Sequence, residues 1–300
     1  MAHPLLQQLA QHDKRALARA ISMVENETTG YEELLKALPN KQIPVIGITG
    51  PPGAGKSTLI SALTQCMLLG GKKVAIIAVD PSSPFNRGAL MGDRVRMSEH
   101  FLHPDVFIRS MASRGSLGGL SPKILEVTDV LKGAWFDYII IETVGVGQSE
   151  VEIASLADTT ILALVPEAGD DIQTIKSGVM EIADIYVLNK ADRAGANTFY
   201  KNLTMLAHSH ATSEWETPVV RTVATKNEGL DELLQAIESH GRANEHSSRK
   251  AVLVAEKALT LIKNMRTKDI LFPQLLDEIR VALQDQNFNL YQYVSKYRKG

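Results

Sequence analysis

The sequence is poor in several features that would assign a protein to a particular class. It has one cysteine, Cys66, among 300 residues, so no disulfide can form within the chain, and a reducing compartment fits best. Its 32 lysines and arginines nearly balance 34 acidic residues, and the net charge of -2 argues against a nucleic-acid surface or an electrostatic membrane contact. The N-terminus shows no basic stretch followed by an apolar run, and no apolar run approaches the ~20 residues that span a bilayer. We therefore expect a cytoplasmic protein with no secretory signal, no membrane contact and no nucleic-acid partner.

The chain does contain a series of short apolar runs that are rich in β-branched residues and separated by longer amphipathic segments. Continuous apolar strands that alternate with helices are typical of a parallel sheet with helices on both faces. The runs are VIGIT (45–49), VAIIAV (74–79), VFI (106–108), YIII (138–141), TILALV (160–165), IYVL (185–188) and VVRTV (219–223). The pattern predicts an α/β fold with a doubly wound, mainly parallel sheet.

Helical segments flank this core at both ends of the chain. The helices expected outside the core span residues 4–26, 31–38, 250–265 and 273–284. A polar link, GRANEHSSR, follows a helix that ends near His240 and separates the core from the last helices. The expected division is an N-terminal helical extension (1–40), a nucleotide-binding domain (41–240) and a C-terminal helical arm (241–300).

The segment VIGITGPPGAGKSTLI places Gly50-x4-Gly55-Lys56-Ser57 between a strand and a helix, as the Walker A pattern of P-loop NTPases requires. The glycines let backbone N–H groups surround phosphate oxygens, and the helix N-terminus favours the negative charge. Lys56 is expected to reach the β- and γ-phosphates, and the Ser57 hydroxyl to ligate Mg²⁺. The expected phosphate-binding residues are Gly50, Pro51, Pro52, Gly53, Ala54, Gly55, Lys56, Ser57 and Thr58.

A second motif, VLNKAD, ends a later strand with Asn189, Lys190 and Asp192. A carboxylate can accept the N1–H and the 2-amino group of guanine together, and adenine has no such pair of donors. In this interpretation Asn189 braces the loop and the stem of Lys190 lies over the base. The segment TVATKNEGLDEL follows the next strand, where a backbone N–H near Ala224 or Thr225 is placed for the guanine O6. The motifs predict a protein that binds GTP and GDP.

Three acidic residues are candidates for the metal site of such a protein. Asp80 ends the second strand, Asp93 follows in LMGDRVRM, and Glu142 ends the strand of IIIETVGVGQSE. With Ser57 they supply the oxygen ligands that Mg²⁺ prefers, directly or through water. Glu142 stands where small GTP-binding switches carry aspartate, and its longer side chain can reach a metal-bound water or orient the attacking one. Gln148 either positions a water or is an exposed loop residue; the catalytic candidates are thus Lys56, Glu142 and Gln148.

Longer stretches of the sequence carry a family resemblance. The segments are RALARAISMVEN, GITGPPGAGKSTLI, VDPSSP, GDRVRM, ETVGVGQSE and GDDIQTIKSGVMEIADIYVLNKAD, within about residues 13–240. They resemble the metallochaperone-type branch of P-loop GTPases and, more narrowly, the MeaB/ArgK group. Members of that group are GTPase chaperones of adenosylcobalamin-dependent methylmalonyl-CoA mutase.

The resemblance implies further roles. Ser57, Asp80, Asp93 and Glu142 would match the residues that handle Mg²⁺. The segment PEAGDDIQTIKSGVMEIAD resembles the family's third switch, which couples nucleotide state to the mutase, although by itself it reads as an amphipathic helix with a solvated face. Its working residues would be Asp170, Gln173, Lys176 and Glu181. The C-terminal helices would form a homodimer, but the ending DQNFNLYQYVSKYRKG departs from the family's usual small-residue ending.

Three other kinds of P-loop protein are less compatible with these residues. A nickel or cobalt metallochaperone GTPase would want a Cys-x-x-Cys pair or a His-rich tract, and one cysteine with eight scattered histidines supplies neither. A small-molecule kinase needs a lid and an acceptor pocket, and a guanine-binding NKAD motif is unusual in one. Signal-recognition GTPases are disfavoured by ETVG and by the absence of a Met-rich domain.

We expect a GTPase that is slow alone and is completed by its partner, the mutase.

Overall fold

The computed structural model describes residues 4–80, 97–112, 120–121, 123–143, 149–169, 177–209, 215–244, 249–284 and 288–297. The chain divides into two compact units, residues 1–253 and 254–300, which we describe separately. None of the helices in these described ranges is long and apolar enough to span a membrane.

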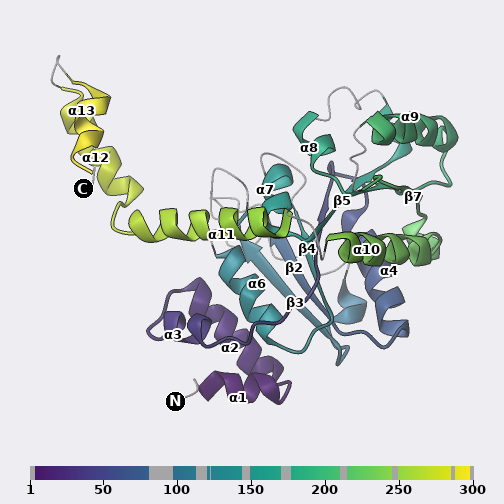
Figure 1. Ribbon diagram of the computed structural model, residues 1–300, viewed down its shortest axis with the longest axis horizontal. Coiled ribbons are helices and arrows are strands. Elements are labelled where there is room, and N and C mark those ends of the chain that lie inside the picture. The colour runs from purple at the N-terminus through teal and green to yellow at the C-terminus, as the bar shows by residue number, and fades with distance from the viewer. Residues whose placement is uncertain are drawn as a thin grey trace. The chain divides into compact units, whose positions relative to one another are not determined.

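The first unit is built on one parallel sheet with helices around it (Figure 1). The sheet has seven strands in the order β3-β2-β4-β1-β5-β6-β7. Each neighbouring pair runs parallel. The strands are β1 (Val45–Thr49), β2 (Val74–Asp80), β3 (Val106–Ala112), β4 (Tyr138–Glu142), β5 (Thr159–Leu164), β6 (Ile185–Leu188) and β7 (Val219–Arg221). The order reverses at β1, which lies between β4 and β5, so the carboxyl end of β1 opens at the switch point where α/β sheets bind ligands. The predicted doubly wound α/β fold is confirmed.

Helices cover both faces of the sheet. The helices of the first unit are α1 (Pro4–Ala10), α2 (Lys14–Glu25), α3 (Tyr31–Lys36), α4 (Lys56–Leu69), α6 (Ile124–Gly133), α7 (Ser149–Leu156), α8 (Ser177–Glu181), α9 (Ala196–Ser209) and α10 (Leu230–Asn244). Short 3₁₀ turns lie at η1 (Ser98–His100), η2 (Pro166–Gly169) and η3 (Ala224–Lys226). Helix α11 (Arg249–Arg266) begins in the first unit and continues into the second.

The side chains of the central strands alternate between two hydrophobic clusters, as the period of two in a strand requires. In β1, Ile46 and Ile48 join a cluster with α4, α9 and α10, whereas Val45 joins one with α1, α2, α3, α6 and α7. Gly47 lies between them, where a Cβ would come within 2.5 Å of Ile153 on α7. Glycine at this position therefore lets α7 pack closely against the strand at the switch point.

Three aspartates, each directly before a strand, close the amino-terminal ends of the sheet in the same way. Each donates its backbone N–H to the carbonyl of a residue on the neighbouring strand, or directly before it, and accepts that residue's N–H with its carboxylate. The pairs are Asp137 with Lys73, Asp158 with Val45, and Asp184 with Thr160, with side-chain distances of 2.7, 2.9 and 2.8 Å and backbone distances of 2.8, 2.8 and 2.9 Å. Each pair fixes the register between two neighbouring strands.

The N-terminal helices are part of the core of the first unit. Leu17, Ile21 and Leu34 are fully buried in the cluster on that face of the sheet. The apolar pattern over residues 4–26 forms two helices instead of one, because His12 adopts a left-handed φ of 61° and Asp13 caps α2 by accepting the N–H groups of the next turn.

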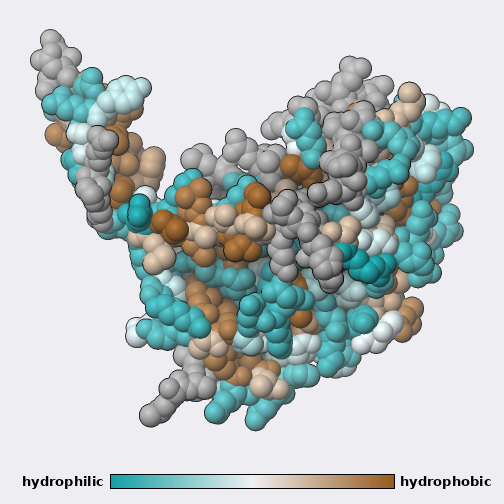
Figure 2. All heavy atoms as spheres, in the orientation of Figure 1, coloured by the Kyte–Doolittle hydropathy of each residue, from teal (hydrophilic) through white to brown (hydrophobic). Residues whose placement is uncertain are grey.

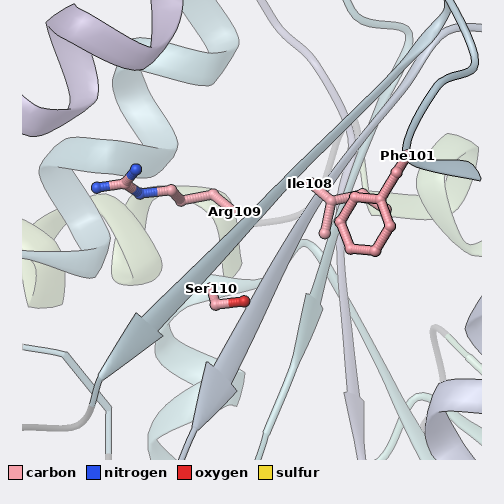
Figure 3. A pocket seen from close by; sticks show the side chains of 4 residues that line it. All are labelled: Phe101, Ile108, Arg109 and Ser110. Atoms are coloured by element: carbon pink, nitrogen blue, oxygen red, sulfur yellow. The ribbon is translucent and has the colours of Figure 1, made fainter. Parts of the chain in front are cut away.

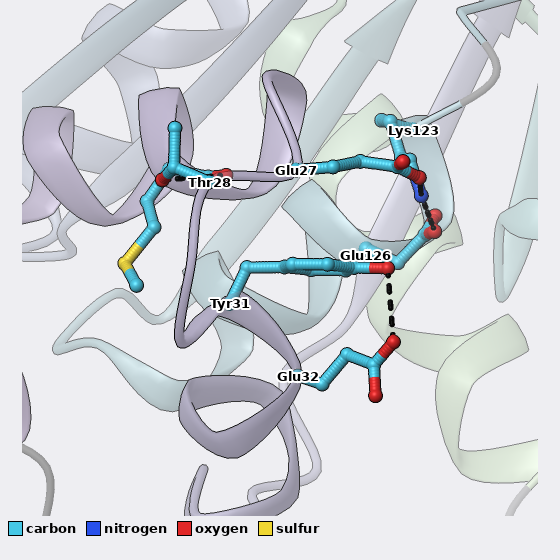
Figure 4. Close-up of polar contacts among 7 residues, drawn as sticks. Glu27, Thr28, Tyr31, Glu32, Lys123 and Glu126 are labelled. Atoms are coloured by element: carbon cyan, nitrogen blue, oxygen red, sulfur yellow. Dashed lines mark hydrogen bonds and ion pairs between the residues drawn. The ribbon is translucent and has the colours of Figure 1, made fainter.

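A polar network ties this extension to α6 (Figure 4). The Lys123 ammonium lies 2.6 Å from a carboxylate oxygen of Glu27 and 2.9 Å from one of Glu126, and 5.4 Å from the centre of the Tyr31 ring. The Tyr31 hydroxyl in turn donates to Glu32 at 3.2 Å. These contacts join α3, the turn before it and the start of α6, so the extension is fixed to the sheet by polar as well as apolar contacts.

The second unit consists of the rest of α11, α12 (Phe272–Ala282) and α13 (Leu290–Ser295). None of the residues of α12 or α13 is buried. Apolar side chains are exposed along these helices; they include Leu259, Ile262, Met265, Phe272, Val281 and Val294. Figure 2 shows brown, hydrophobic atoms on the visible face of this part of the chain. The unit thus presents apolar surface that its own packing does not cover.

The aspartate pairs generate a stability prediction. Asp158→Ala is expected to lower the free energy of unfolding by about 1–3 kcal/mol, because the buried N–H of Val45 loses its acceptor. Asp158→Asn, which keeps an oxygen at that position, is the matched control and is expected to lose less. Urea denaturation of the three proteins measures the difference, and an alanine variant as stable as the wild type would show that the pair does not stabilise the sheet.

Candidate functional site

The phosphate-loop residues lie between β1 and α4, in a conformation that requires glycine at two positions. Gly50 has φ of 140°, and a Cβ there would lie 2.1 Å from the backbone oxygen of Ala163 on β5. Gly55 has φ of 82°, and a Cβ there would lie 2.6 Å from the amide nitrogen of Asn189. The loop is therefore held between β5 and the loop after β6 by contacts that a larger residue would prevent.

Lys56 begins α4 and is only 7% exposed. Its ammonium donates to the carbonyls of Gly50, at 2.8 Å, and Pro51, at 3.2 Å. The charge thus lies inside the loop that is expected to surround the phosphates. Of the other expected loop residues, Ala54 and Ser57 are buried, Pro51, Gly55 and Thr58 are half-buried, and Pro52 and Gly53 are exposed.

Ser57 and Glu142 meet directly at the carboxyl end of the sheet. The Ser57 hydroxyl donates to Glu142 Oε1 at 2.7 Å, and both residues are buried. Beside them the Thr143 hydroxyl donates to that of Thr49 at 2.9 Å. A buried hydroxyl and carboxylate at the start of the phosphate-loop helix form an oxygen donor set of the kind that Mg²⁺ takes, so these residues fit the expected metal.

Asn189 connects three loops. Its amide nitrogen donates to the carbonyl of Ala54 in the phosphate loop at 2.9 Å. Its amide oxygen accepts the Thr222 hydroxyl at 3.2 Å and the backbone N–H of Ala224 at 3.4 Å. Lys190, with a left-handed φ of 55°, donates to the carbonyl of Gly53 at 2.8 Å. The structure therefore brings the NKAD loop, the phosphate loop and the turn after β7 together, as the sequence interpretation requires.

Two neighbouring residues of the loop after β6, Asp192 and Arg193, each form an ion pair. The Lys226 ammonium lies 3.0 Å from Asp192 Oδ2, and this hydrogen bond lowers the pKa of the Asp192 carboxyl. Arg193 pairs with Glu167 of η2, and that hydrogen bond lowers the pKa of the Glu167 carboxyl. Both acids stay ionised at neutral pH, and Asp192 remains exposed for a ligand.

Several predicted site residues lie outside the described residues. These are Asp93, Gln148, Asp170, Gln173 and Lys176, and the side chain of Asp80. Of the expected switch residues, Glu181 is described: it ends α8, and its side chain is exposed. Thr225 is exposed in η3, beside the buried Ala224.

The sequence interpretation missed the residues that support the motifs. Thr222 holds the oxygen of Asn189, Lys226 pairs with Asp192, and Thr49 contacts Thr143. Their only signal in the sequence is a polar residue at or just after a strand end, which is too common to select them without the structure.

A separate hollow of about 420 Å³ lies at the edge strand β3 and is lined by Phe101, Ile108, Arg109 and Ser110 (Figure 3). Arg109 turns its guanidinium toward α2, where it pairs with Glu25. The described lining brings no charged groups together, so this hollow is not a candidate for the chemistry.

The chain is similar to several known proteins. A Pyrococcus abyssi relative is 48% identical over 255 residues, which are 83% of this chain and 79% of that protein. A mouse relative is 34% identical over 248 residues, and the match covers 75% of this chain and 59% of that protein. Its name is methylmalonic aciduria type A homolog, mitochondrial. A crystal structure described as LAO/AO transport system kinase matches with a TM-score of 0.69 and 27% identity, over 98% of this chain and 95% of that one.

Residues 17–277 match a protein family that is described as methylmalonyl Co-A mutase-associated GTPase MeaB. That range includes the phosphate loop, the NKAD loop and the segment between them. The match confirms the resemblance drawn from the motifs, and the chain belongs to the MeaB family of GTPases.

Proposed function

We propose that this GTPase is a chaperone of an adenosylcobalamin-dependent methylmalonyl-CoA mutase, in which GTP binding and hydrolysis gate the loading and protection of the cofactor. The observation that carries the proposal is the family match over residues 17–277, because that family is described by its association with the mutase. The mouse relative, named for methylmalonic aciduria, supports the same partner.

In this proposal the residues at the carboxyl end of the sheet bind and position GTP. Lys56, whose ammonium already lies within the phosphate loop, exchanges the carbonyls of Gly50 and Pro51 for phosphate oxygens. Ser57 and Glu142, together with Asp80 and Asp93, hold Mg²⁺, which when bound neutralises charge on the phosphates. Asp192 accepts the guanine donors, and the N–H of Ala224 or Thr225 donates to O6.

Glu142 is the residue at which we expect the partner to complete the site. Its Oε1 accepts the Ser57 hydroxyl, which places the carboxylate beside an expected metal ligand. We assign the positioning of the attacking water to Glu142 or Gln148, and its completion to the complex with the mutase. The segment 168–183 acts as the switch that couples the two proteins, through Asp170, Gln173, Lys176 and Glu181.

The C-terminal helices are proposed to form a homodimer. Val252, Ala255, Leu259 and Ile262 recur on one side of α11, and Leu259 and Ile262 are 51% and 46% exposed. Exposed apolar stripes of this length mark contact surfaces in soluble proteins.

Nothing in the described residues favours metal delivery instead. They contain no group of three His, Cys, Asp or Glu side chains placed to hold a metal ion. Burial, with a hydrogen bond to Asp231, raises the pKa of the Cys66 thiol to about 11, so the metal-free side chain is a neutral thiol at neutral pH.

Lys56→Ala is expected to slow GTP hydrolysis by about 100-fold or more, because the charge that meets the phosphate oxygens is lost. Lys56→Met keeps most of the buried stem and is expected to be equally slow, while Lys72→Met, which removes an exposed lysine at the other end of the sheet, is expected to hydrolyse normally. Single-turnover hydrolysis with a urea denaturation control measures this. A wild-type rate in Lys56→Ala would mean that the site is wrongly assigned.

Removal of residues 248–300 is expected to convert a dimer to a monomer, and Leu259→Glu is expected to weaken the dimer by placing a charge in its apolar contact. Asn264→Glu, on the opposite side of α11, is the control. Sedimentation over micromolar concentrations decides between the states. A full-length monomer would refute the proposal, as would a dimer that survives truncation.

The chaperone proposal is tested by GTP turnover with and without a methylmalonyl-CoA mutase from the same source. The wild type is expected to be stimulated, and Lys176→Ala to keep its GTP affinity but lose most of the stimulation, because a partner can shift a switch only by binding one of its states more tightly. Absence of stimulation in the wild type would remove the main support for the proposal. Equal stimulation of both proteins would leave the chaperone role and exclude Lys176 from it.

A further inference from the structure

Asp192 and Lys226 belong to two different loops and meet at the expected base site. Asp192 lies in the loop after β6, and Lys226 ends η3, the turn after β7. Their charged atoms are 3.0 Å apart, and the side chains are 40% and 54% exposed. At that exposure an ion pair contributes little to stability. The folding of the protein therefore does not explain why the two loops present these charges to each other.

Both loops are fixed from behind, so the pair has a defined geometry. Asn189 joins the start of the first loop to Ala224 of the second, and the N–H of Ala191 donates to the carbonyl of Thr222 at 3.1 Å. Lys226 is held in its turn by donation of its N–H to the carbonyl of Val223 at 2.8 Å. The backbone of Lys226 is thus anchored, and its ammonium meets the carboxylate from the side of the turn after β7.

A carboxylate has about four acceptor positions on its two oxygens, so Asp192 can accept Lys226 and the two guanine donors at the same time. Without Lys226 the exposed side chain is free to rotate, and a bidentate contact would have to immobilise it on binding. With Lys226 in place the carboxylate is already ionised and oriented. The lowered pKa of Asp192 agrees with this arrangement.

We propose that Lys226 is a specificity-determining residue of the guanine site, which orients the Asp192 carboxylate for the N1–H and 2-amino donors of the base. The inference rests on the proposed role of Asp192 in guanine binding. In this role Lys226 contributes to discrimination between bases. It does not contribute to phosphate binding, which we assign to the phosphate loop.

The test compares dissociation constants for GDP and IDP, which lacks the 2-amino group, by calorimetry on the full chain. Lys226→Met is expected to weaken GDP binding about threefold and IDP binding less, so that the GDP preference falls. Lys226→Arg, which keeps a cationic donor, is expected to retain the preference. Lys72→Met removes an equal charge far from the site and is expected to change neither constant. Thermal denaturation of each variant checks that it is folded.

The outcomes separate this inference from the role of Asp192. If Asp192→Ala keeps the wild-type preference for GDP, the proposed guanine contact itself is wrong. If Asp192→Ala loses the preference but Lys226→Met keeps it, Lys226 has no part in specificity. Tighter GDP binding by Lys226→Met would also overturn the inference, because Lys226 would then compete with the base for Asp192.

Discussion

The arrangement of the candidate site depends on the hydrogen bonds of the Asn189 side chain. With one amide group it holds the carbonyl of Ala54 in the phosphate loop and the N–H of Ala224 in the turn after β7. These loops come from the two ends of the GTPase core in sequence, and only the parallel sheet brings them to one edge. Because the asparagine is 2% exposed, its hydrogen bonds face little competition from water. The loops that we propose to bind phosphate and base are thereby held at a fixed separation.

The use of glutamate at position 142 follows from the register of the sheet. Glu142 lies opposite Ile48 on β1 and Ala78 on β2, so the strand ends before the phosphate loop has begun. Ser57 lies beyond that loop, at the second residue of α4. The longer acid reaches the Ser57 hydroxyl at 2.7 Å from this position. An aspartate on the same backbone would be shorter by one methylene, so the choice of acid reflects where β4 ends.

The sequence was sufficient for the features that depend on local pattern. Five of the apolar runs match their strands to within one residue at each end, whereas VVRTV extends two residues beyond β7. The phosphate loop and the NKAD loop directly follow strands, as expected. Strand β3 was underestimated as VFI, because Arg109 and Ser110 interrupt the apolar run although β3 extends to Ala112. Arg109 is accommodated there by Glu25, which is 84 residues away in the sequence. Contacts of that kind, like the pairing of Lys226 with Asp192, have no signature in a single sequence.

Strands β4 and β6 have a stabilising aspartate directly before their first residue and a candidate site residue at their carboxyl end. On β4, Asp137 closes the ladder with Lys73, and Glu142 emerges five residues later; on β6, Asp184 closes the ladder with Thr160, and Asn189 emerges five residues later. A shift of one residue in register would move either side chain by about 3.3 Å and turn it to the opposite face of the sheet. Such a shift would separate Glu142 from Ser57 and Asn189 from Ala54. The aspartates, which lie at the opposite end of the sheet from the candidate site, thus help to set the positions of Glu142 and Asn189.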